Sequence, residues 1–125
     1  MVLVSYPMVG AQKGDSREQI LLDLPQNVDV LFVSGDRDSM CSVDRLQMAA
    51  DKMKTRTWIA IVEGADHGMS AKPKSTDEPT RKATGRLAAE WLASREESGR
   101  FCKLSWNAEK RRVDSTGWRS ELEPR

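Results

Sequence analysis

The chain's only histidine, His67, lies in the polar, glycine-containing segment Glu63 to Met69. A second polar segment, Ser34 to Cys41, carries the carboxylates Asp36 and Asp38. A carboxylate that meets an imidazole fixes the ring's tautomer and supports the imidazolium, while the other ring nitrogen accepts a proton. An acid from one segment and the histidine from the other therefore predict a general base, which needs a nucleophile to act on.

Each polar segment directly follows a short apolar run rich in β-branched residues, Val28 to Val33 and Thr57 to Val62, and a third such run spans Val2 to Tyr6. All three are predicted strands. The middle run is almost continuously apolar, which is typical of a parallel strand covered on both faces. Parallel sheets collect functional residues at the carboxyl ends of their strands, so the two polar segments are expected to meet if the second and third strands are neighbours.

Helical patterns separate the predicted strands. The first opens near Ser16 and closes before Pro25, the second spans about Ser42 to Lys54, and the third about Pro79 to Ala93. Ser16 with Gln19 has the spacing of a capping box, and Ser42 is a predicted helix cap. Alternating strands and helices predict an α/β fold with three parallel strands in the spatial order first, second, third.

The length of 125 residues suits a single domain, predicted over residues 1–93. Residues 94–125 are crowded with charge and lack sustained periodicity, and their apolar side chains are too widely spaced to form one face. We expect this segment to be a disordered tail, detached from the fold. The apolar side chains in question are Phe101, Leu104, Trp106, Val113, Trp118 and Leu122.

Composition limits the partners and the setting. A net charge of +1 provides no field that favours nucleic acid, and the short basic cluster Lys110 to Arg112 is interpreted as a solvated patch. The apolar opening is too short to span a membrane. Cys41 and Cys102 have no paired spacing, which favours an intracellular setting, cytoplasmic or nuclear. With one histidine and dispersed cysteines, neither a metal nor another cofactor is expected.

The order strand, Gly-x-x-Asp, helix, strand, Asp-His-Gly resembles the way α/β-hydrolases present the last two members of their triad. The resemblance is greatest to the KANL/Tex branch, which contains testis-expressed protein thirty and the third subunit of the NSL histone-acetyltransferase complex and is related to dienelactone hydrolases. It covers roughly Val2 to Ala93. The residues that carry it are Ser5-Tyr6-Pro7, Phe32-Val33-Ser34-Gly35, Asp38, Met40-Cys41, Lys52-Met53 and His67-Gly68-Met69.

Carried over residue by residue, the resemblance makes Asp38 the triad acid, because it holds the fourth position of Gly-x-x-Asp, and makes His67 the triad base. Asp36 is expected to support the local turn, since Asp commonly bonds its own backbone there. Asp66 is expected to face away from the neighbouring ring.

The sequence departs from the family pattern at the nucleophile. The family's serine occupies a Gly-x-Ser-x-Gly elbow upstream of the acid, and no such pentapeptide occurs here. The elbow and an upstream loop also build the oxyanion hole. The chain is therefore interpreted as the C-terminal part of a hydrolase domain, inactive alone, whose complete form would act on an ester-type substrate. A truncated gene sequence, a short isoform and a remnant are all compatible with it.

Two alternatives stay open. Cys41 is a conceivable substitute nucleophile, although a cysteine beside Met40 at a helix start is more typical of a small buried hydrophobe. Ser34 and Ser39 are interpreted as turn residues. A non-catalytic interaction module is the rival function, and the bare outer edge of the first strand is the predicted surface for self-association or a partner.

Overall fold

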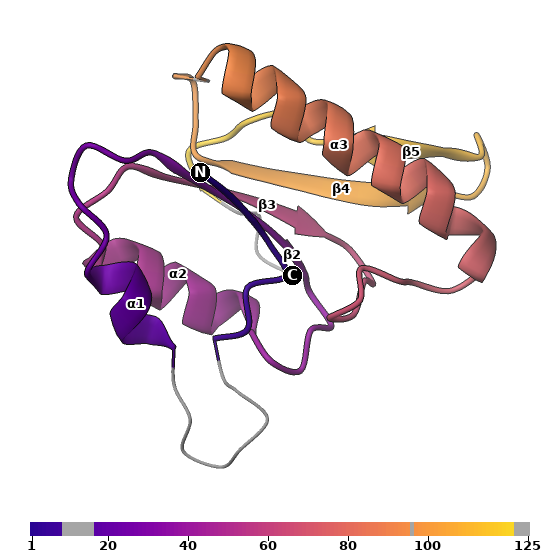
Figure 1. Cartoon of the computed structure of the whole chain (residues 1–125). Coiled ribbons are helices and arrows are strands. Elements are labelled where there is room, and N and C mark those ends of the chain that lie inside the picture. Colours follow the sequence, from indigo (N-terminus) through magenta and orange to yellow (C-terminus); the bar gives the residue numbers. More distant parts are fainter. Residues whose placement is uncertain (9–16, 96, 122–125) are drawn as a thin grey trace.

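The computed structural model describes residues 1–8, 17–95 and 97–121. It contains a five-stranded sheet in the order β1-β2-β3-β4-β5, in which the first four strands are parallel and β5 is antiparallel to β4. Helices α1 and α2 cover one face and α3 covers the other (Figure 1). The elements are β1 (Val2–Val4), α1 (Glu18–Leu22), β2 (Val30–Gly35), α2 (Val43–Lys52), β3 (Thr57–Val62), the 3-10 turn η1 (Lys74–Thr76), α3 (Asp77–Ala93), β4 (Phe101–Asn107) and β5 (Arg112–Ser115).

The central strand β2 is buried along its whole length, as its continuous apolar run predicts. Val30 and Phe32 point into the core formed with α1 and α2. Leu31 and Val33 point to the opposite face and pack in the core that contains Trp91 of α3. This alternation follows from the period of two along a strand, and it confirms the α/β class with a layer of helix on each side.

The predicted strand bounds hold to within a few residues. The third strand has the expected bounds. β2 is shifted by two residues at both ends, from the expected 28–33 to Val30–Gly35, and Ser34 and Gly35 pair with the end of β3. The first strand ends early, since Ser5 has a positive φ of 53° that turns the chain out of the extended region. The order of the first three strands and their parallel pairing are as predicted.

The helix starts follow their capping chemistry. The Ser42 side chain accepts a hydrogen bond of 3.2 Å from the Arg45 amide, which confirms the predicted cap of α2. Helix α3 begins at Asp77, slightly before the expected Pro79, and its acidic first turn suits the positive end of the helix dipole. The expected capping box at Ser16 lies outside the described residues.

The expectation of a disordered, detached tail over residues 94–125 is wrong for its described part. β4 adds to the sheet beside β3, and β5 returns along β4 as a hairpin. Cys102 and Leu104 are buried on the α3 face. A strand that joins an existing sheet needs only alternate apolar residues, so wide spacing that rules out a helical face does not rule out a strand.

An ion-pair cluster lies at the amino ends of β2 and β3, and the two polar loops extend from the opposite, carboxyl ends of these strands. The Asp29 carboxylate, just before β2, accepts hydrogen bonds from Arg56 and Arg95 at 2.8 to 3.0 Å. These hydrogen bonds, led by that of Arg56, lower the pKa of Asp29. Within the part of the chain that the structure describes, no helix is long and apolar enough to cross a membrane.

Candidate functional site: an acid and a histidine at the sheet edge

Two loops meet where β2 and β3 end, because the two strands are parallel neighbours in register. Gly35 pairs with Val62, so the chain leaves both strands at the same level. A Cβ atom at Gly35 would collide with the carbonyl group of Ala65 in the second loop. Glycine is therefore required at this position for the backbones to approach this closely.

Main-chain hydrogen bonds continue the contact between the loops beyond the last strand pair. The Asp36 amide donates to the Val62 carbonyl at 3.2 Å, and the Arg37 amide donates to the Ala65 carbonyl at 2.9 Å. The second loop turns at Gly64, whose φ of 78° is readily adopted only by glycine. The two loops are thus held together by backbone geometry before any site side chain contributes.

Asp38 and His67 lie in direct contact. The Nδ1 atom of His67 is 2.9 Å from Oδ2 and 3.1 Å from Oδ1 of Asp38. Oδ1 also accepts the Met40 amide at 2.8 Å, so the carboxylate is fixed by its own loop as well. The Asp38 side chain is fully buried, whereas the His67 side chain is 39% exposed.

This arrangement gives the two ring nitrogens different roles. When Nδ1 carries the proton it donates to the carboxylate, and Nε2 is then the nitrogen with a free lone pair. The buried carboxylate favours that tautomer and stabilises the imidazolium once Nε2 takes a proton. Chemically, the pair can serve as a general base whose accepting nitrogen belongs to the more exposed partner.

The other two aspartates of the loops accept hydrogen bonds from backbone amides. Asp66 accepts hydrogen bonds from Gly68 and Ser70, both at 3.0 Å, and is therefore occupied inside its own loop. Asp36 makes a contact that the sequence does not predict, because its Oδ1 accepts the amide of Gly64 across the two loops at 2.7 Å.

The structure bears on the alternative nucleophiles. Cys41 is 2% exposed and belongs to the core formed with α1 and α2. Burial, and next the nearby Asp38 charge, raise the pKa of its thiol to about 11, which opposes formation of the nucleophilic thiolate. Ser34, expected in a turn, is a buried residue of β2, since the strand extends to Gly35. Ser39 lies in the turn, as expected.

A second link ties the histidine loop to α3. The Ser70 hydroxyl donates to the carboxylate of Asp77, at 3.1 Å from each oxygen, in the first turn of that helix.

No cluster of three or more potential metal ligands occurs among the described residues.

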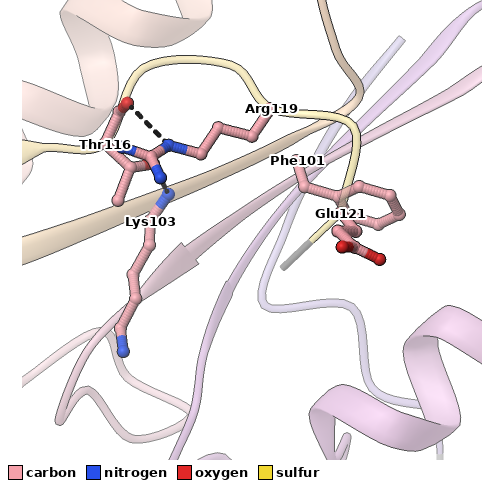
Figure 2. A pocket seen from close by; sticks show the side chains of 5 residues that line it. All are labelled: Phe101, Lys103, Thr116, Arg119 and Glu121. Atoms are coloured by element: carbon pink, nitrogen blue, oxygen red, sulfur yellow. Dashed lines mark hydrogen bonds between the residues drawn. The ribbon is translucent and has the colours of Figure 1, made fainter. Parts of the chain in front are cut away.

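A surface hollow lies elsewhere, where the chain crosses back over the start of β4. Figure 2 shows the Arg119 guanidinium donating to the Thr116 carbonyl at 3.2 Å beside Lys103. None of the lining residues belongs to the two loops that carry Asp38 and His67. The residues that line the hollow are Phe101, Lys103, Thr116, Arg119 and Glu121.

Comparison with known families agrees with the α/β fold of the sheet and its helices. The model of the alpha/beta hydrolase domain family matches residues 1–96, and the chain therefore belongs to this family. The match includes both loops of the candidate site and ends before β4. No solved structure matches the chain.

Sequence reasoning missed two parts of the site, the cross-loop role of Asp36 and the close approach at Gly35. A glycine that ends a buried strand is a signal for such an approach. The hydrogen bond of Asp36 has no comparable signal, because it depends on the register between β2 and β3.

Proposed function

We propose that this chain supplies the acid and the base of a serine-hydrolase triad, with Asp38 as the acid and His67 as the base. The observation that carries the proposal is the contact between His67 Nδ1 and the buried Asp38 carboxylate, at the carboxyl ends of neighbouring parallel strands. Membership of the α/β-hydrolase family supports it, because that family orders its triad as nucleophile, acid, histidine.

In the proposed reaction, Nε2 of His67 takes the proton of a serine hydroxyl as the oxygen attacks an ester carbonyl. Asp38 keeps the ring in the productive tautomer and stabilises the imidazolium that forms. The imidazolium then returns the proton to the leaving alcohol, and a water molecule repeats the sequence to release the acid. The substrate class is accordingly an ester or a related acyl compound.

The nucleophile of this reaction comes from outside the 125 residues, which contain no Gly-x-Ser-x-Gly elbow. The oxyanion hole comes with that elbow in this family. Both contributions are therefore absent when the chain acts alone, and we propose that the isolated chain is inactive. Its two free cysteines favour an intracellular setting for the complete enzyme.

The finer assignment is to the KANL/Tex branch, carried by the motifs Phe32-Val33-Ser34-Gly35 and His67-Gly68-Met69. A chromatin-complex subunit in that branch makes a non-catalytic interaction module the second candidate function. One observation favours it: the outer edge of β1 pairs with no strand among the described residues, and Val4 on this strand is 56% exposed.

The test compares the chain alone with the chain fused behind the N-terminal half of an α/β-hydrolase that carries the elbow. The fusion should hydrolyse an activated ester. Asp38→Asn should reduce kcat by roughly 10⁴-fold and His67→Ala by roughly 10⁶-fold, as in other triads. Asp51→Asn, which changes an exposed carboxylate on α2, is the matched control and should leave the rate unchanged. Equal activity of the fusion and its His67→Ala variant would favour the interaction module.

A further inference from the structure

Asp36 is a loop carboxylate that the proposed triad does not use and that binds across the two loops. It lies two positions before Asp38, at the point where the first loop leaves β2. Its side chain is partly buried and its Oδ1 accepts the Gly64 amide at 2.7 Å, the shortest of the hydrogen bonds given above between the two loops. A hydrogen bond to a carboxylate is shorter and stronger than one between neutral groups.

The backbone amide and the side chain of Asp36 each bind the chain where β3 leads into the second loop. Its amide donates to the Val62 carbonyl at 3.2 Å, and its carboxylate receives the amide two residues further on, at Gly64. Asp36 therefore binds the chain at two points, at the last residue of β3 and at the second residue of the loop that carries His67. Gly64, with its φ of 78°, is the residue at which that chain changes direction.

The position of the ring depends on that change of direction, because His67 follows Gly64 by three residues. Nδ1 must come within hydrogen-bonding distance of a carboxylate whose own place is fixed by the Met40 amide. A small rotation at the start of the loop would carry the ring away from Asp38, and catalytic groups tolerate displacements of only about 0.5 Å.

We propose that Asp36 is a positioning residue, which fixes the start of the histidine loop through the Gly64 amide so that His67 meets Asp38. The inference rests on the proposed function and deepens it. It gives each of the three loop aspartates a separate role, in which Asp38 contacts the ring, Asp36 orients the loop from outside, and Asp66 shapes the loop from within through Gly68 and Ser70.

A competing explanation is that Asp36 acts on His67 by charge through space. The two explanations predict different effects of two substitutions. Asp36→Asn removes the charge but keeps an oxygen that accepts the Gly64 amide, whereas Asp36→Ala removes both. A positioning role is preserved in Asp36→Asn and lost in Asp36→Ala, while a through-space role is lost equally in both.

The experiment measures the ring ¹⁵N chemical shifts of His67 in the full chain at a pH where the ring is neutral. Wild type, Asp36→Asn and the exposed-carboxylate control Asp51→Ala should all show the tautomer with the proton on Nδ1. Asp36→Ala should show a mixture of both tautomers. An unchanged tautomer in Asp36→Ala, or an equal change in Asp36→Asn and Asp36→Ala, would overturn the inference.

Failure of the proposed function gives a different result. If Asp38→Asn leaves the His67 tautomer of wild type unaltered, the acid and the base are not coupled, and the triad proposal itself fails.

If Asp36→Ala does not fold, hydrogen exchange of the Gly64 amide in wild type and Asp36→Asn tests the positioning role instead. The Gly64 amide should exchange at least about tenfold more slowly in wild type and Asp36→Asn than an unbonded loop amide. Exchange at the unbonded rate would refute the positioning role.

Discussion

At the scale of single residues, the candidate site contains two groups, Asp38 and Cys41, that lie close together in different surroundings. The Asp38 carboxylate is buried but accepts a hydrogen bond from its own loop and faces the ring of His67. The Cys41 thiol is buried in the core beside it, and the Asp38 charge further disfavours its thiolate. Loop chemistry thus supports an acid and a base and opposes a cysteine nucleophile.

The raised pKa of Cys41 predicts how stability depends on pH at the alkaline end. The thiol ionises at its ordinary pKa of 9.0 when unfolded but only at about 11 when folded, so the folded state holds the proton more tightly. Its contribution is present below pH 9 and is lost as pH rises from 9 to about 11. The free energy of unfolding should fall across this window by on the order of 1–3 kcal/mol more in wild type than in Cys41→Ala.

Urea denaturation of both proteins at several pH values measures this difference. The comparison cancels the titration of the lysines, which the two proteins share. Parallel pH profiles for wild type and Cys41→Ala would show that the thiol is accessible to solvent, and Cys41 would then return as a candidate nucleophile.

At the scale of elements, the site depends on how closely the loops after β2 and β3 cross. Gly35 allows the crossing, because any Cβ there would overlap the Ala65 carbonyl group. Backbone has to move to relieve such an overlap, since a carbonyl cannot rotate away as a flexible side chain can. The distance between Asp38 and His67 is therefore linked to the absence of a side chain at Gly35.

Replacing Gly35 by alanine should lower the free energy of unfolding by roughly 1–3 kcal/mol, the usual cost of forcing extra atoms into a packed site. Gly85→Ala is the matched control, because a Cβ at Gly85 in α3 meets nothing within 4 Å. That substitution should stabilise the chain by about 0.4–1 kcal/mol, since alanine favours a helix. Thermal unfolding followed by circular dichroism measures both; a neutral Gly35→Ala would contradict the crossing.

The elements that the sequence predicts well are those with a strong local signal. Apolar runs predict β2 and β3, and Ser42 predicts the cap of α2. The position of His67 follows from the end of β3. β4 escapes prediction because only Cys102 and Leu104 are buried on it, a pattern that becomes stable through pairing with β3. Such pairing is non-local, and no window of sequence contains it.

At the scale of the whole molecule, the sheet has two different outer edges. β5 closes one side as a short charged strand, with Arg112 and Asp114 bound to each other at 2.9 Å. β1 forms the other side with apolar residues, and no described strand pairs with its outer edge. Charged residues protect an edge from further pairing, whereas an apolar edge invites it.

We expect the chain to self-associate through β1 as its concentration rises. Val4→Lys should shift the equilibrium toward monomer, because a lysine on an edge strand opposes pairing with another strand. Ile20→Lys on α1 is the matched control, since Ile20 is similarly exposed, at 61% against 56% for Val4. Sedimentation equilibrium measures the association of wild type and both variants. A wild-type monomer at every concentration, or equal effects of the two lysines, would contradict pairing through the β1 edge.

The chain as a whole is proposed to supply the acid and the base of a hydrolase triad but not its nucleophile. Labelling with a fluorophosphonate probe, followed by mass spectrometry, is the decisive experiment for this division. We predict no adduct on the isolated chain. In the fusion with an elbow-bearing half, we predict one adduct, on the elbow serine, whose formation slows sharply in His67→Ala. An adduct on Cys41 or any serine of the isolated chain, or labelling of the fusion that does not depend on His67, would contradict the proposal.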